Sequence, residues 1–174
     1  MSVKGEEKSR QMSKCYHGAD GKVQKVPLTQ PPPPQKKRGL RGKIAESKQE
    51  EMTDYMKNAV ALVKAYVPPE PVLIQKAKDN GKISVTPLPG QRARLTFSDY
   101  LKPSDSFAVE VDLTSNRPVG ARIATYLDSK QDVVTLDVRF STLDSSATYA
   151  AKVNLNVPGK NVNVAVENSG YRRQ

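Results

Sequence analysis

Apolar and polar positions divide the chain into a helical segment followed by a series of strands. Over residues 43–67, apolar side chains recur at steps of three and four, which predicts a helix of roughly 37 Å with one apolar face. That face is formed by Ile44, Met52, Tyr55, Met56, Ala59, Leu62, Val63 and Tyr66. Because an apolar helix face needs a surface to pack on, we expect this helix to lie across a sheet.

Prolines and a glycine set the predicted ends of the helical part. The long helix is expected to stop at Val67, because the prolines of the following segment, Pro68, Pro69 and Pro71, cannot continue it. Residues 72–80 predict a short second helix that Gly81 closes. Residues 43–81 are therefore expected to form a helical insertion.

From residue 82 onward, apolar and polar residues alternate with a period of two, which is typical of strands with one buried face. Short connections between the strands predict an antiparallel up-and-down meander over residues 82–168. The inward positions are predicted to be Ile83, Val85, Ala93, Leu95, Phe97, Phe107, Val109, Val111, Leu113, Val119, Ala121, Ile123, Thr125, Val134, Leu136, Val138, Phe140, Tyr149, Ala151, Val153, Leu155, Val157, Val162, Val164 and Val166.

The strand register is predicted by matching apolar residues on one face and opposite charges on the other. The apolar pairs are Val109–Ile123, Leu136–Val153 and Val153–Val166. The charged pairs that follow from them are Glu110–Arg122, Asp137–Lys152 and Lys152–Glu167. Exposed ion pairs contribute about 0.2–1 kcal/mol each, so they indicate register more than they stabilise the fold.

The remaining segments carry weaker patterns. Residues 1–28 predict a hairpin that joins the sheet, with a turn at 19–21. Residues 29–42 form a proline-rich basic loop, and residues 169–174 a tail. The predicted fold is one α+β domain: a curved, half-barrel-like antiparallel sheet of about six to eight strands, with one long amphipathic helix and one short helix on its apolar face.

Composition limits the classes of protein that fit. The chain has 174 residues, 37% of them hydrophobic, which suits one moderate core. The net charge is +10, but most cations alternate with 18 acids, which argues against a specific nucleic-acid surface.

No apolar run approaches the roughly 18 residues of a membrane span, and residues 1–10 lack the apolar core of a signal peptide. If Met1 is the true start, a cytoplasmic protein is expected.

One basic patch stands out, in and after the proline run. Its members are Lys36, Lys37, Arg38, Arg41 and Lys43. This segment is interpreted as a solvated loop, as a polyproline ligand for an aromatic groove, or as a contact for phosphate or lipid headgroups.

Candidate chemistry is sparse. His17 is the only histidine and Cys15 the only thiol, and such a pair lacks the third group and the oxyanion donors of a nucleophilic site. Two ligands do not complete a zinc site, and no segment has the spacing of a phosphate loop. We therefore expect a non-enzymatic protein with no catalytic residues, no metal and no cofactor.

Several segments resemble recurring blocks of a family of uncharacterised bacterial exported proteins. They are VPPEP at 67–71, DYLKPSD at 99–105, TSNR at 114–117, ATYLD at 124–128, VTLDVRF at 134–140 and VENSGY at 166–171. Ser104 departs from the family, where glycine is usual. No activity comes with the likeness. It implies a signal peptide, a helix and a strand ahead of the segment at 4–6, hence an N-terminally truncated chain and a periplasmic or secreted protein.

The order of elements is also similar to the lipoprotein-carrier fold of the bacterial periplasm, in which helices cover a half-barrel. We therefore expect a carrier for a hydrophobic ligand or acyl chain held between sheet and helix. The candidate ligand-facing residues are Met52, Met56, Leu62, Phe97, Val109, Ile123, Val138, Phe140 and Val153. The alternatives are a structural or protein-interaction domain without ligand, and polyanion or lipid-headgroup binding through 36–43. Self-association through an uncovered sheet edge is also expected.

Overall fold

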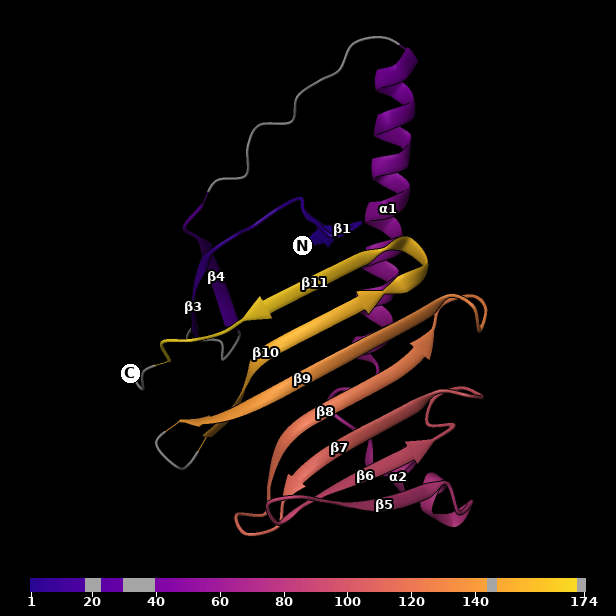
Figure 1. The fold of residues 1–174 in the computed structure, drawn as a ribbon, viewed down its shortest axis with the longest axis vertical. Coiled ribbons are helices and arrows are strands. Elements are labelled where there is room, and N and C mark those ends of the chain that lie inside the picture. Colours follow the sequence, from indigo (N-terminus) through magenta and orange to yellow (C-terminus); the bar gives the residue numbers. More distant parts are fainter. Residues whose placement is uncertain (18–22, 30–39, 144–146, 172–174) are drawn as a thin grey trace.

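The computed structural model describes residues 1–17, 23–29, 40–143 and 147–171. Within these residues the chain forms an α+β fold with two helices, one nine-stranded sheet and one two-stranded sheet (Figure 1). The elements are β1 (Ser2–Val3), β2 (Glu6–Glu7), β3 (Ser13–His17), β4 (Val23–Pro27), α1 (Leu40–Lys64), α2 (Pro71–Asp79), β5 (Ile83–Leu88), β6 (Arg92–Ser98), β7 (Ser106–Asp112), β8 (Arg117–Tyr126), β9 (Val133–Leu143), β10 (Ala147–Val157), the 3₁₀ turn η1 (Pro158–Lys160) and β11 (Val162–Glu167).

The large sheet is an antiparallel meander from β5 to β11, as the sequence predicts. Its strand order is β2-β1-β11-β10-β9-β8-β7-β6-β5, so consecutive strands are neighbours along most of its width. The sheet has nine strands rather than six to eight, because β1 pairs with β11 and β2 pairs with β1. It is open, with β2 and β5 as its two edges.

The N-terminal hairpin forms, but it does not join the large sheet. β3 pairs antiparallel with β4 from Ser13–Pro27 to His17–Val23, and the predicted turn lies outside the described residues. The two strands make a separate sheet, and their described side chains are all exposed. The hairpin has little apolar surface to bury, which explains why the shorter β1, with its half-buried Val3, takes the place beside β11 instead.

Helix α1 begins and ends three residues earlier than predicted, at Leu40 and Lys64. After Lys64, the N–H groups of Ala65, Tyr66 and Val67 bond to carbonyls three residues back, which tightens the chain into a turn. This change follows from Pro68, since the residue before a proline avoids the helical conformation. Pro71 occupies the first turn of α2, where its missing N–H costs no hydrogen bond.

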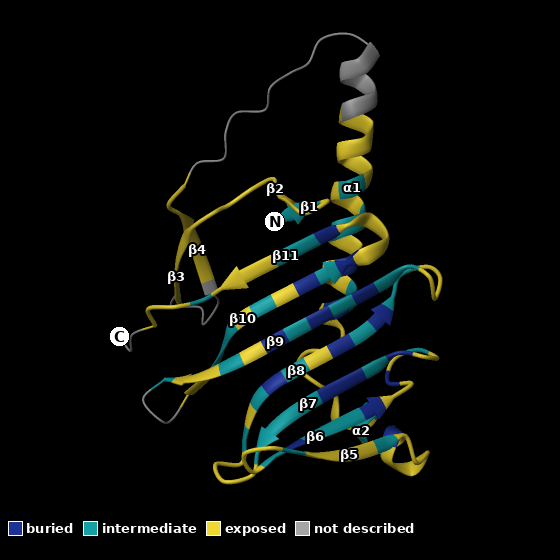
Figure 2. Cartoon of the chain, in the orientation of Figure 1, coloured by how far each residue is buried: buried dark blue, intermediate teal, exposed yellow. Residues whose placement is uncertain are grey.

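α1 crosses the apolar face of the sheet near the β8–β9 connection. The Tyr55 hydroxyl donates to Asp132 in that connection, and Lys160 Nζ of η1 lies 5.1 Å from the Tyr55 ring centroid. Ala59 and Val63 are buried against the core. Met52, Tyr55, Met56 and Leu62 are half-buried and pack on it. The described side chains before Met52, residues 46–51, are exposed where α1 passes beyond β11 (Figure 2).

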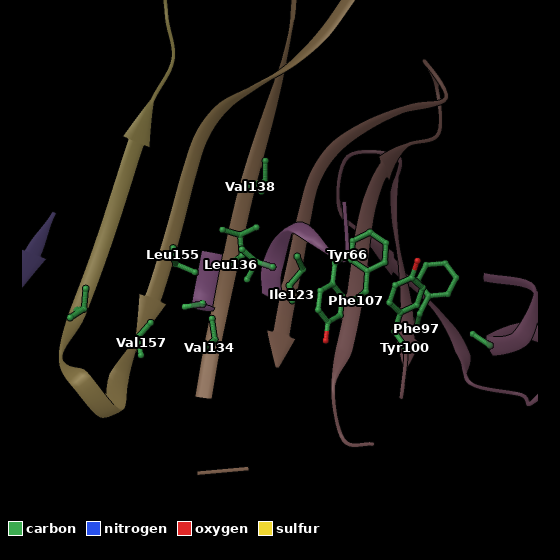
Figure 3. Close-up of a cluster of buried hydrophobic side chains, with 14 residues drawn as sticks. Tyr66, Phe97, Tyr100, Phe107, Ile123, Val134, Leu136, Val138, Leu155 and Val157 are labelled. Atoms are coloured by element: carbon green, nitrogen blue, oxygen red, sulfur yellow. The ribbon is translucent and has the colours of Figure 1, made fainter. Parts of the chain in front are cut away.

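The buried cluster combines aromatic rings and aliphatic side chains (Figure 3). Tyr66, Phe97, Tyr100 and Phe107 pack in stacked and tilted pairs with ring centroids 5.2–6.1 Å apart. Val134, Leu136, Leu155 and Val157 continue the cluster toward β10. The cluster therefore spans the sheet from β6 to β11 and holds the C-terminal end of α1.

A buried carboxylate lies beside the aromatic rings. Asp105 is 3% exposed and accepts hydrogen bonds from the Tyr66 hydroxyl at 2.5 Å and from the backbone N–H groups of Tyr100, Leu101 and Lys102. The Tyr66 oxygen also lies 2.8 Å from the Thr125 hydroxyl. This network ties the end of α1 to the β6–β7 connection and to β8.

One predicted register is confirmed and two are wrong. Val153 pairs with Val166, and Lys152 forms an ion pair with Glu167 at 3.0 Å. In the other two strand pairs, the register of the structure differs from the predicted one by two residues. A shift of two residues leaves each side chain on the same face of the sheet, so the alternation of apolar and polar residues cannot distinguish the two registers. The pairs in the structure are Phe107–Ile123, Val109–Ala121, Leu136–Leu155 and Val138–Val153. Glu110 therefore faces Gly120 rather than Arg122, and Asp137 faces Asn154 rather than Lys152.

Two irregularities in the ladders also change which side chains face the core. Between Ala150 and Lys152 the register with β9 shifts, and Ala150 packs on the core. Tyr149 instead stacks on Tyr171, with centroids 4.3 Å apart, so the predicted inward position of Tyr149 is wrong. A second shift lies between Glu110 and Val111, and Leu113, predicted to face inward, is 55% exposed beyond it. Such bulges are not encoded in a simple alternation.

Tyr66→Phe is expected to lower the free energy of unfolding by about 1–3 kcal/mol, because Asp105 and Thr125 each lose a buried partner. Urea denaturation followed by circular dichroism measures this change. Tyr16→Phe is the matched control, since Tyr16 is 39% exposed and its change should be within about 0.5 kcal/mol. An equal, small effect of both substitutions would contradict the role given to the network.

Candidate functional site

Three neighbouring rows of apolar side chains run across the strands on the apolar face of the sheet, next to a shorter, buried row of Thr125, Val134, Val157 and Val162. The inner row lies under the C-terminal part of α1 and contains Ile83, Phe97, Phe107, Ile123, Leu136, Leu155 and Val164. The middle row contains Val85, Leu95, Val109, Ala121, Val138, Val153 and Val166. The outer row contains Pro87, Ala93, Val111, Pro118, Phe140 and Ala150.

Most side chains of the middle and outer rows are less buried than the inner row, although Val138 of the middle row and Ala93 of the outer row are buried too, at 9% and 7% exposure. The central members of the inner row, from Phe97 to Leu155, are 1–8% exposed. In the middle row Leu95, Val109, Ala121 and Val153 are only half-buried, and the two ends are open, with Val85 at 63% and Val166 at 44%. We call the middle and outer rows together the apolar strip. It is the part of the apolar face that α1 leaves incompletely covered.

The sheet residues predicted to face a ligand divide between covered and uncovered positions. Phe97 and Ile123 lie in the inner row and are core residues, at 5% and 1% exposure. The other four belong to the apolar strip: Val109, Val138, Phe140 and Val153. All of these except Val138 are half-buried.

The helix residues predicted to face a ligand all contact the core. Met52, Met56 and Leu62 are half-buried and pack against the buried cluster. They contact the cluster from the side of the helix. The structure thus brings all nine predicted residues to one side of the sheet, as core members or in contact with the core.

The opposite face of the sheet carries a network of charges. Glu110 accepts hydrogen bonds from Arg94 at 2.7 Å and from Arg139 at 3.1 Å, and Arg122 pairs with Asp137 at 2.6 Å. The Glu110 side chain is only 15% exposed. The Arg94 hydrogen bond, with the charge of Arg139, lowers the pKa of Glu110 below its ordinary value of 4.5.

A small hollow of about 10 Å³ lies among these charges. Gly120 and Ala108 form part of its lining, and a Cβ atom at Gly120 would approach the Val138 carbonyl oxygen to 3.2 Å. The hollow has room for little more than one water molecule. The network is therefore best explained as cross-strand pairing that stabilises the sheet, and sequence analysis missed it because its partners were assigned in the wrong register.

The other candidate residues from the sequence, the basic patch and Cys15, do not form a site among the described residues. Lys36, Lys37 and Arg38 of the basic patch lie outside the described residues, and Arg41 and Lys43 fall in the first turns of α1. Cys15 is exposed on β3. Among the described residues no group of three or more His, Cys, Asp or Glu side chains is placed to hold a metal ion. Neither helix, over its described length, is apolar enough to cross a membrane.

Comparison with protein families, curated proteins and solved structures gives no match to this chain. The resemblances drawn from sequence blocks and element order therefore remain predictions.

Glu110→Gln is expected to destabilise the protein by about 1 kcal/mol at neutral pH, because both arginines lose a charged acceptor. The lowered pKa of Glu110 means that its contribution is present above about 4.5 and is lost as the pH falls through the folded-state value. The difference between the two proteins should therefore shrink on acidification. Chemical denaturation at pH 7, 5 and 3.5 measures it, and a difference that is constant with pH would contradict this account.

Proposed function

We propose that this protein is a non-enzymatic carrier or binding module for a hydrophobic ligand, a single acyl chain, that lies along the apolar strip beside α1. The observation that carries the proposal is the gradient of exposure from the buried inner row to the half-exposed middle row. An acyl chain placed on the middle row would remove from water the apolar surface that α1 leaves open, which is favourable in proportion to its area.

The form of the strip suits a long, narrow apolar ligand. The middle row crosses seven strands, from β5 to β11, which corresponds to about 29 Å at the usual spacing between strands. No charged or polar side chain interrupts either row of the strip. Met52 and Met56 on α1 flank the face with flexible side chains that adapt to different apolar shapes.

The second candidate is a structural or protein-interaction domain that binds no ligand. The nearly complete burial of Phe107, Ile123 and Leu155 favours it, since the inner row is already filled by protein side chains. The two candidates differ only in what covers the middle and outer rows. A third candidate function is polyanion binding through residues 36–43. The sequence resemblance separately suggests the proposal that the protein is exported.

Phe140→Ser is expected to weaken binding of palmitate about tenfold, because it removes the largest side chain of the outer row and leaves a hydroxyl in its place. Palmitate affinity is measured by isothermal titration calorimetry, and native mass spectrometry after mild extraction tests for a co-purifying lipid.

Leu28→Ser is the matched control, since Leu28 is a 63% exposed apolar residue outside the large sheet. Its palmitate affinity should equal that of the unmodified protein. A protein that purifies without lipid and does not bind palmitate would support the second candidate. Equal weakening by both substitutions would also argue against the apolar strip as the site.

A further inference from the structure

The two edges of the large sheet differ in length and charge. β2 has two residues, both glutamates, and Lys8 and Arg10 pair with them. β5 has six residues, ISVTPL, with no charge, and its residues 84–87 are exposed. Short, charged edge strands resist pairing with other chains, whereas a longer uncharged edge promotes it. The β2 edge is therefore protected, and the β5 edge is open.

The direction of the β5 backbone groups follows from one hydrogen bond. The Ser98 N–H donates to the Lys82 carbonyl at 2.9 Å, so this carbonyl points toward β6 and the N–H of Ile83, on the other side of the same peptide, points away from it. Because this direction alternates along a strand, Ser84 and Thr86 also point toward β6, and Ile83, Val85 and Pro87 point outward. The open edge thus presents three carbonyls but only two N–H donors, since proline has none.

We propose that the β5 edge binds the β5 edge of a second copy of this chain, antiparallel and with a two-fold axis at Val85. In this register the two Val85 residues exchange a pair of hydrogen bonds. Ile83 then lies opposite Pro87 of the second copy and donates to its carbonyl. Every outward donor of both strands is used, and the missing donor of Pro87 costs one bond in each copy, the bond to the Ile83 carbonyl opposite.

The surrounding side chains fit the same arrangement. Val85 is 63% exposed at the end of the middle row, so pairing buries it beside its own counterpart and joins the apolar strips of the two copies. α2 lies at the Ile83 end of the strand, where the Lys82 N–H donates to Ala77 at its C-terminal end. The two-fold axis therefore places the two α2 helices at opposite ends of the paired strands, where they do not meet. An interface of this kind uses the same patch on both copies.

Val85→Lys tests the proposal in solution, since it sets two cations directly opposite each other across the axis. Sedimentation velocity over a concentration series should show a monomer–dimer equilibrium for the unmodified chain, and Val85→Lys should raise its dissociation constant at least about tenfold. Val26→Lys is the matched control, because Val26 is also an exposed strand valine and lies on β4 of the separate sheet. A monomer at all concentrations, or a dimer that responds to Val26→Lys instead, would overturn the proposal.

A disulfide tests the register directly. In a Cys15→Ser background, Val85→Cys should form a covalent dimer on mild oxidation, because opposite residues of a hydrogen-bonded pair lie about 5.5 Å apart at Cα, within disulfide range. Thr86→Cys should not, since its counterpart is displaced by two residues along the strand. Cross-linking at 85 alone supports the two-fold register, and cross-linking at 86, at both positions or at neither overturns it. The result does not depend on whether the strip binds an acyl chain.

Discussion

The fold depends on a carboxylate that has been removed from water. Burying an ionised group is costly unless hydrogen bonds replace its hydration, and Asp105 receives four: three from consecutive backbone N–H groups and one from Tyr66. The donors come from two segments, the β6–β7 connection and the residues that follow α1. The β6–β7 connection is held in one conformation, and the end of α1 is fixed against β8. No buried side-chain N or O atom among the described residues is left without a partner.

With α1 fixed at that end, the rest of its path determines how the sheet face is divided. The helix crosses the strands near the β8–β9 connection, so the inner row is packed, whereas most side chains of the rows beyond it are half-buried or exposed. The opposite face balances its charges locally, with Glu110 between two arginines and Asp137 beside Arg122. The sheet thus has a charge-neutralised face and an apolar face that is only partly covered, and only the second offers surface that association would stabilise.

Some of this could be predicted from the sequence and some could not, for identifiable reasons. Alternation over 82–168 gives the strands, their order and their inward faces, because each of these depends on a local period. It does not give register, since a two-residue shift preserves every face, nor the bulge beside Ala150 that turns Tyr149 outward. The Asp105 network was also missed: Tyr66 and Asp105 are far apart in sequence, and a lone aspartate in a turn has the pattern of a solvated residue.

β1 pairs the first residues of the described chain with β11, near its other end. Pairing β1 with β11 closes a loop of almost the whole chain, which costs conformational entropy, and only two residue pairs of β-ladder compensate for this cost. We therefore expect β1 to pair with β11 after the meander has formed, and to detach before the meander unfolds. The amide hydrogens at this edge should exchange with solvent through local opening, while those of β7–β9 exchange only with global unfolding. The sheet therefore combines a stable centre with one edge that opens readily.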